Sequence, residues 1–340
     1  MKNGRAVYLQ TNDAGANELV AFRRADDGSL EKVGTYATGG RGTGKPHLPS
    51  QSSLVVTSDG GVLVGNAGSD DVALFVAGET GLTLSDRVAS GGSTPTSVAE
   101  RDGLVYVLNN GSATISGFRI SGGKLVALEQ STRSLSSPDA DPAQISFSPD
   151  GRSIVVTERG TNSITVFAVD ENGFAGEATT VRSAGETPYG FDFTRDGCVV
   201  VTEAFGGASG RAAASSYRLE GAELAPVSES VADTRSEVCW AAVTKDGRFV
   251  YVTNFGDGTI SSYAVRTGGS IELANPVAAA TRMGEAGVRD EAITRDGEFL
   301  YALDADSQRV HGWRIGADGT LDEIGSWDGL PATVAGLAAS

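Results

Sequence analysis

The amino-acid sequence predicts an all-β fold, a seven-bladed β-propeller with four antiparallel strands in each blade. Three observations lead to this prediction. An Asp-Gly pair between strand-like runs recurs at intervals of 43 to 50 residues. Glycine accounts for 46 of the 340 residues and proline for only 10, which is typical of a chain with many tight turns. Repeats of this length that contain four strands are the blades of a propeller.

The recurrent pair predicts a hairpin between the first and second strand of a blade. Asp-Gly between hydrophobic runs favours a type I′ turn, because both central residues of that turn need positive φ angles. The pairs at this position are Asp59-Gly60, Asp102-Gly103, Asp150-Gly151, Asp196-Gly197, Asp246-Gly247 and Asp296-Gly297.

The remaining strands of each blade follow the pair in order. The second strand is an apolar run, as at residues 104–107, 154–156 and 249–252. A polar turn comes next, and then a third strand in which apolar and polar residues alternate, as at residues 164–167 and 260–263. A turn containing glycine leads to a weaker fourth strand. Each unit therefore reads as four antiparallel strands.

The N-terminal unit lacks a first strand of its own. Its strands are predicted at residues 6–11, 19–23 and 32–36, and Asn3-Gly4 takes the place of the Asp-Gly pair. We expect the C-terminal tail, residues 331–337, to supply the missing strand, because this closure leaves no open edge in the ring. Six internal units and one unit closed by both termini give seven blades in a single domain of residues 1–340.

Composition excludes several functional classes. The formal charge of −16 opposes nucleic-acid binding, and no apolar run reaches the roughly 18 residues of a membrane-spanning helix. Two cysteines and two histidines cannot build a disulfide scaffold or a multi-histidine zinc centre, so neither a metal nor another cofactor is expected. No signal peptide is visible, which predicts a cytoplasmic protein. We expect a monomer that binds a small molecule.

The repeat sequences resemble a known family. Blade six carries Tyr251-Val252-Thr253-Asn254 after a Thr-Lys-Asp-Gly-Arg turn, and residues 142–152 of blade four match the same pattern. Over nearly its whole length the chain resembles the seven-bladed lactonases with YVTN-type repeats, which include bacterial 6-phosphogluconolactonases and fungal carboxymuconate cyclases. The resemblance implies a metal-independent site at the channel mouth, where Arg, Glu and His open or form a lactone ring. The family's histidines at the Pro-His positions are here replaced, except at Pro46-His47.

The propeller geometry selects the candidate substrate-binding residues. The loop that enters each first strand and the hairpin between the second and third strands lie at the same end of the channel, so residues far apart in sequence converge there. Among these, Tyr189, Phe205 and Trp240 would form an aromatic wall, although Trp240 can equally pack between blades. The predicted substrate-binding residues are Gln51, Asn66, Asn109, Gln144, Tyr189, Phe205, Trp240, Asn254 and Asp290.

The candidate catalytic residues are two carboxylates, two arginines and one histidine. Glu158 and Glu203 occupy equivalent places after Val-Thr, and a shielded carboxylate there can act as general base or acid. Arg159 or Arg289 would stabilise an oxyanion or a substrate carboxylate. His47, after a glycine-rich loop, is a further candidate base. The alternative is that the carboxylates cap turns or pair with neighbouring arginines.

Two functions therefore remain open at this point. The first is a lactonase-like hydrolase, or a lactone-forming or lactone-opening isomerase, that acts on a small cyclic ester at the channel mouth. The second is a non-catalytic propeller that binds a small molecule or a protein on its top face, because propellers support many unrelated functions. Asp290, Glu291 and Asp304 have the oxygen ligands that Ca²⁺ prefers, but they lack an Asp-x-Asp loop, so no metal site is predicted.

Overall fold

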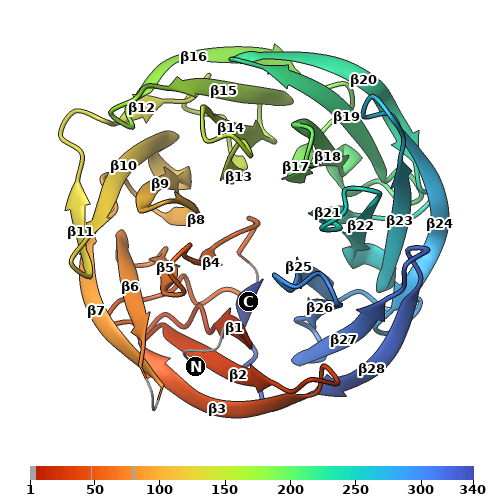
Figure 1. Cartoon of the computed structure of the whole chain (residues 1–340), viewed down its shortest axis with the longest axis horizontal. Coiled ribbons are helices and arrows are strands. Elements are labelled where there is room, and N and C mark those ends of the chain that lie inside the picture. The colour runs from red at the N-terminus through yellow and green to blue at the C-terminus, as the bar shows by residue number, and fades with distance from the viewer. Residues whose placement is uncertain (1–4, 47, 79–80) are drawn as a thin grey trace.

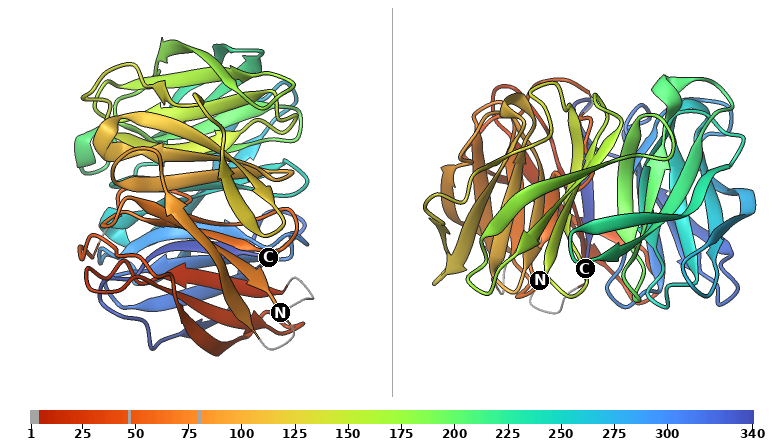
Figure 2. Two further views of the ribbon diagram at one scale, coloured as in Figure 1. Left: turned by 90° about the vertical axis from the view of Figure 1, so that its left-hand side faces the viewer. Right: turned by 90° about the horizontal axis from the view of Figure 1, so that it is seen from above.

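Seven β-sheets are arranged radially around one axis in the computed structural model, which describes residues 5–46, 48–78 and 81–340 (Figure 1). Each sheet is one blade, and its first strand is innermost. Seen from the side, the outer strands cross the wall of the ring obliquely, as expected for twisted sheets (Figure 2). The predicted seven-bladed fold is confirmed. Among the described residues, no helix has the length and apolarity needed to span a membrane.

The strands are assigned to the blades as follows. Blade one contains β29 (Ala335–Ala339), β1 (Ala6–Gln10), β2 (Glu18–Arg24) and β3 (Leu30–Ala37), and blade two contains β4 (Leu54–Val56), β5 (Val62–Asn66), β6 (Asp71–Ala77) and β7 (Leu82–Ala89). Blade three contains β8 (Pro95–Arg101), β9 (Leu104–Asn109), β10 (Thr114–Ser121) and β11 (Lys124–Ala127), with the short β12 (Arg133–Ser134) also paired to β10.

The other four blades have four strands each. Blade four contains β13 (Pro142–Phe147), β14 (Ser153–Glu158), β15 (Ser163–Val169) and β16 (Ala175–Arg182), and blade five contains β17 (Pro188–Phe193), β18 (Cys198–Glu203), β19 (Ala213–Glu220) and β20 (Glu223–Ala232). Blade six contains β21 (Val238–Val243), β22 (Phe249–Asn254), β23 (Thr259–Val265) and β24 (Ile271–Ala280), and blade seven contains β25 (Val288–Ile293), β26 (Phe299–Asp304), β27 (Arg309–Ile315) and β28 (Leu321–Trp327).

The ring is closed by strands from both ends of the chain, as predicted. β29 pairs antiparallel with β1, with Leu9 opposite Leu337 and Val7 opposite Ala339. The closing strand begins at Ala335, closer to the C-terminus than the predicted residues 331–337. Ser340 extends the closure, since its backbone N–H donates to the Ala6 carbonyl at 2.9 Å. The edge of β1 is thereby paired rather than exposed.

The Asp-Gly hairpins form as predicted, but the type I′ turn is wrong for most of them. Gly247 has a φ of 74°, whereas the preceding Asp246 is not among the residues with positive φ. The turn instead places the Gly247 N–H on the Thr244 carbonyl at 2.7 Å, while the Thr244 hydroxyl donates to the Asp246 carboxylate at 2.7 Å. Asp therefore acts as an acceptor within a longer turn, and glycine alone supplies the left-handed conformation.

Tyrosines of the second strands lock neighbouring blades together. The hydroxyl of Tyr251 in blade six donates to the Gly319 carbonyl in the outer turn of blade seven, at 3.0 Å. Tyr301 makes the equivalent bond to Gly28 of blade one at 2.5 Å. Both rings are fully buried, so each tyrosine fills the space between two sheets while its hydroxyl is satisfied. The tyrosine of the YVTN motif thus has a structural role.

Candidate functional site

The first strands of most blades begin with a β-bulge, and the bulges determine which side chains reach the axis. The ladder between β25 and β26 skips from Val288 to Glu291, and the corresponding skips occur in blades three to six. A bulge turns the inserted residues away from the regular alternation. In blades five to seven these residues are Tyr189, Gly190, Cys239, Trp240, Arg289 and Asp290.

Tyr189 and Trp240 of this layer lie together with Arg159 of blade four. The rings of Tyr189 and Trp240 are 4.9 Å apart, centroid to centroid. The guanidinium of Arg159 stacks on the Tyr189 ring at 4.8 Å and donates to its hydroxyl at 3.3 Å. Arg159 also forms an ion pair with Asp141 at 2.6 Å. The convergence of blades four, five and six at one end of the channel therefore follows the predicted geometry.

The guanidinium of Arg289 stacks on an aromatic ring, and its Nε–H donor has no hydrogen-bond partner among the described residues. Its guanidinium lies 4.0 Å from the centroid of the Phe255 ring, and its side chain is 13% exposed. The nearest carboxylate, Asp306, is 3.9 Å away, beyond hydrogen-bond range. Within the described part of the chain its Nε has no hydrogen-bond partner. Arg289 is thus fixed in orientation and still has a free hydrogen-bond donor, so it can bind an anion or an oxyanion.

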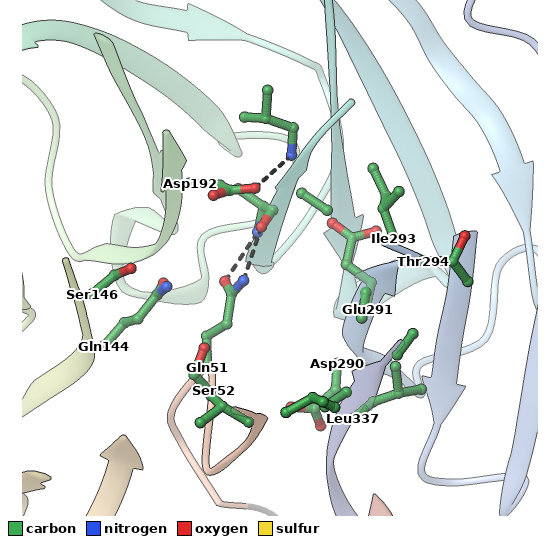
Figure 3. Close-up of a pocket in the computed structure, with 18 of the residues that line it drawn as sticks. Gln51, Ser52, Gln144, Ser146, Asp192, Asp290, Glu291, Ile293, Thr294 and Leu337 are labelled. Carbon is green, nitrogen blue, oxygen red and sulfur yellow. Dashed lines mark hydrogen bonds between the residues drawn. The ribbon is translucent and has the colours of Figure 1, made fainter. Parts of the chain in front are cut away.

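Below the bulges an axial cavity of about 360 Å³ extends along the first strands (Figure 3). Its polar lining includes Gln51, Gln144, Asp192, Asp290 and Glu291, and two basic residues, Lys245 and Arg295, also line it. Apolar residues such as Leu54, Ile293 and Leu337 form the rest of the wall. The volume suits a small organic molecule.

Gln51 crosses the channel from blade two to blade six. Its amide nitrogen donates to the Ala241 carbonyl at 2.8 Å, and its amide oxygen accepts from the Ala241 N–H at 3.2 Å (Figure 3). Gly190 leaves room for this crossing, since a Cβ there would lie 2.4 Å from the Gln51 amide oxygen. Gln144 makes a similar pair with the backbone of Phe191 in the next blade. Both predicted residues line the cavity, but their amide groups are already bonded.

Three carboxyl groups of the cavity have raised pKa values. Burial raises the pKa of Asp290 to about 7, although the Gly336 N–H and the charge of Arg289 act in the opposite direction. Burial also raises the pKa of Asp192 to about 6, against backbone hydrogen bonds from Val243 and Phe193. The pKa of Glu291 is raised well above its ordinary value by burial and by the negative charge of Asp192.

The thiol of Cys239, in the same layer of bulges, is not a nucleophile at neutral pH. Burial raises its pKa to about 12, because the thiolate is disfavoured away from water.

Glu158 and Glu203 do not face the channel, so their predicted placement at its mouth is wrong. Both are fully buried, and neither is among the described residues that line the axial cavity. Glu203 accepts hydrogen bonds from the Gly185 N–H and from the hydroxyls of Ser215 and Ser230, at 2.6 to 2.7 Å. Glu158 accepts from Ser136 and from Thr165. These contacts agree with the alternative interpretation, in which the two carboxylates cap turns and have no catalytic role.

The asparagines at the equivalent positions also point into their blades. Asn66, Asn109 and Asn254 are fully buried at the ends of their second strands. Asn254 donates to the Ser261 hydroxyl at 2.8 Å, and Asn66 donates to the Asp71 carboxylate at 2.6 Å. Their predicted place at the channel mouth is wrong for the same reason as that of the two glutamates. The end of the second strand turns its side chain towards the third strand.

Two other predicted residues lie elsewhere. Phe205 stacks under Arg211 of its own blade at 4.9 Å and does not join Tyr189 and Trp240 in the predicted aromatic wall. His47 lies outside the described residues. Asp192 is not among the predicted residues, although a charged residue between Phe191 and Phe193 in a channel-lining strand points to a polar position at the axis. Glu291, predicted only as a possible cation ligand, also lines the cavity.

Comparison with known proteins identifies the family. The profile of the family described as lactonase, 7-bladed beta-propeller, matches residues 53–205 and 204–335, which is most of the chain. The chain belongs to this lactonase family. Family membership supports an enzyme of the lactonase type that acts on a small molecule. None of the curated proteins compared with it matches the chain.

Solved structures of bacterial proteins share the fold of this lactonase. A candidate 6-phosphogluconolactonase from Bacteroides uniformis is 20% identical, with a TM-score of 0.76 over 98% of this chain and 99% of that one. The periplasmic gluconolactonase of Pseudomonas aeruginosa is 17% identical, with a TM-score of 0.74 over 97% and 98%. A protein from Lactobacillus plantarum is 16% identical, with a TM-score of 0.77 over 98% of both chains.

Proposed function

We propose that this lactonase hydrolyses a small cyclic ester in the axial cavity, with Asp290 as general base and Arg289 as the group that stabilises the oxyanion. The observation that carries the proposal is the position of Asp290, a buried carboxyl that lines the cavity and directly follows Arg289 in the same bulge, close enough for the charge of Arg289 to lower its pKa. Glu158 and Glu203, the first candidates for the base, are replaced in this role because their oxygens are bonded inside the blades.

The proposed reaction needs one base and one positive donor. Asp290 accepts a proton from water while the water oxygen attacks the ester carbonyl carbon. Negative charge that develops on the carbonyl oxygen is stabilised by Arg289. When the carbon–oxygen bond of the ring breaks, Asp290 returns the proton to the leaving alkoxide. The products are a carboxylic acid and an alcohol on one open chain, and the reverse sequence forms the ring.

The local environment supports both roles. A base with a pKa of about 7 is ionised in half of the molecules near neutral pH, and it binds a proton strongly enough to remove one from an attacking water. Stacking on Phe255 fixes the orientation of Arg289, which reduces the entropy lost when an oxyanion forms. Arg159 stacks on Tyr189, and the proposed role of this pair is to orient the substrate, whereas Trp240 is fully buried behind the Tyr189 ring.

The proposal is tested by titrating the acid released from a panel of γ- and δ-lactones. Asp290→Asn is expected to lower kcat/KM by roughly a hundredfold or more, as for the loss of a general base. Asp322→Asn changes an exposed aspartate on β28 and is the matched control, which should retain the parent rate. Equal rates for both variants would overturn the assignment of Asp290. Binding without any acid release would favour a non-catalytic small-molecule protein.

A further inference from the structure

We propose that the cyclic ester accepted by this cavity carries an ammonium group, which Glu291 and Asp192 bind. The inference rests on the proposed lactone hydrolysis and narrows its substrate to cationic cyclic esters. It distinguishes this chain from a relative whose substrate carries a phosphate or a carboxylate, because such a group would face three carboxyl groups in a cavity whose two basic lining residues, Lys245 and Arg295, follow the ends of their strands.

Glu291 is a buried carboxyl whose oxygens have no hydrogen-bond partner among the described residues. Its side chain is only 4% exposed, it lines the axial cavity, and neither carboxyl oxygen has a hydrogen-bond partner among the described residues. Buried polar atoms are nearly always paired, and leaving one unpaired is destabilising. Figure 3 shows the Glu291 side chain extending from β25 into the space that Asp192 faces from β17. A ligand that donates hydrogen bonds at this point would satisfy both oxygens.

Asp192 makes the same place favourable for positive charge. Its two oxygens accept the N–H groups of Val243 at 2.8 Å and Phe193 at 2.7 Å, which fix the carboxyl at the cavity wall. Asp192 is close enough to Glu291 for its charge to disfavour ionisation of that glutamate. A cation between the two carboxylates would turn this repulsion into attraction.

The basic residues around the cavity do not neutralise this pair. Arg295 follows the end of β25, and its Nη2 donates to the carbonyl of Thr57 at 2.5 Å and to that of Val56 at 3.3 Å. Lys245 lies at the same end, two residues beyond the end of β21. Arg289 lies at the opposite end, stacked on Phe255. The middle of the cavity therefore faces carboxyl groups and neutral side chains.

The chemistry of the lining favours an organic ammonium over a metal ion. Within the described ranges no group of three or more His, Cys, Asp or Glu side chains is arranged to hold a metal. Ca²⁺ takes about six to eight oxygen ligands, whereas an ammonium group has three donors and is satisfied by two carboxylates and one further acceptor. The apolar wall formed by Ile293 and Leu337 then accommodates the carbon atoms of the ring.

Binding of unreactive lactams tests the inference separately from catalysis. Three five-membered rings of similar size are compared by calorimetry: α-amino-γ-butyrolactam, uncharged γ-butyrolactam and anionic pyroglutamate. The parent protein should bind the amino-lactam roughly tenfold more tightly than the uncharged ring, as expected for a charge-assisted hydrogen bond. Pyroglutamate should bind most weakly. Equal affinities for the three rings, or tightest binding of pyroglutamate, would overturn the inference.

Variants locate the preference. Glu291→Gln should remove most of the tenfold preference for the amino-lactam, and Asp192→Asn provides a second variant should the first one fail to fold. Glu177→Gln alters an exposed glutamate of β16 and should keep the preference intact. A preference that survives both cavity substitutions would refute the assignment to this pair.

The two proposals fail in distinguishable ways. Selective binding of the amino-lactam without hydrolysis of any lactone would remove the proposed reaction and leave the ammonium site. Hydrolysis that depends on Asp290 but shows no preference for an ammonium group would remove the ammonium site alone.

Discussion

Substitution of Glu203 separates a bracing role from a catalytic one. Glu203→Ala removes the acceptor of three short hydrogen bonds, from the Gly185 N–H at 2.7 Å and from the hydroxyls of Ser215 at 2.6 Å and Ser230 at 2.7 Å. A buried donor left without an acceptor costs about 1 to 3 kcal/mol. The hydroxyls can rotate towards other acceptors, whereas the backbone N–H cannot. With the cavity left by the side chain, we expect a loss of about 4 kcal/mol.

Glu203→Gln should be much milder. The amide oxygen can still accept from Gly185 and Ser215, and the new NH₂ group faces the Ser230 hydroxyl, which can rotate to accept. We expect a loss of about 1 kcal/mol. Urea unfolding of the parent and both variants measures the two differences, and lactone hydrolysis is followed on the same samples. A Glu203→Gln protein that keeps its stability but loses hydrolysis would refute this reasoning and restore Glu203 as a catalytic group.

Three further predictions follow from other parts of the ring. Hydrolysis should increase as the pH rises through about 7, because Asp290 must lose its proton to act as a base; a pH–rate profile with its acidic limb at the ordinary aspartate range would contradict this. Deleting residues 335–340 should lower the free energy of unfolding by roughly 3 kcal/mol or more, because the edge of β1 is unpaired and Leu337 leaves the core; unchanged thermal unfolding would show that the closing strand is dispensable. Gly190→Ala should displace Gln51 and Cys239, whose nearest atoms lie 2.4 and 2.7 Å from the new Cβ, and so cost about 1 to 3 kcal/mol; an unaltered urea midpoint would disprove the close fit.

The repeat was enough to predict the fold, because it is a local signal that recurs along the chain. Asp-Gly turns and apolar second strands lie within a few residues of each other, so their spacing gave the blade number and the closure. The turn type was predicted wrongly because a threonine hydroxyl two residues before the aspartate bonds to its carboxylate, as in Thr244 and Asp246. That contact depends on side-chain orientation rather than on the dipeptide.

The site was only partly predictable, because side-chain direction at the axis depends on the bulges. Tyr189, Trp240, Arg289 and Asp290 lie in the bulges at the start of their first strands, but only Asp290 of these four lines the axial cavity, and Trp240 packs out of reach of solvent. The second strand ends at the same end of the channel, but its last side chain turns towards the third strand. Glu158 therefore contacts Thr165 of β15 instead of the channel, and the residues at the equivalent position in other blades behave in the same way. The crossing of Gln51 to blade six is a contact between residues 190 positions apart, and no local pattern predicts it.

The most direct test of the account is a crystal structure of this lactonase with γ-butyrolactam bound. We predict that the ring occupies the axial cavity, with its carbonyl oxygen within hydrogen-bonding distance of Arg289 and its carbonyl carbon close to the Asp290 carboxylate. A lactam bound instead in the cavity between blades four and five, which Arg152 and Arg195 line, would contradict the assignment of the active site to the axis.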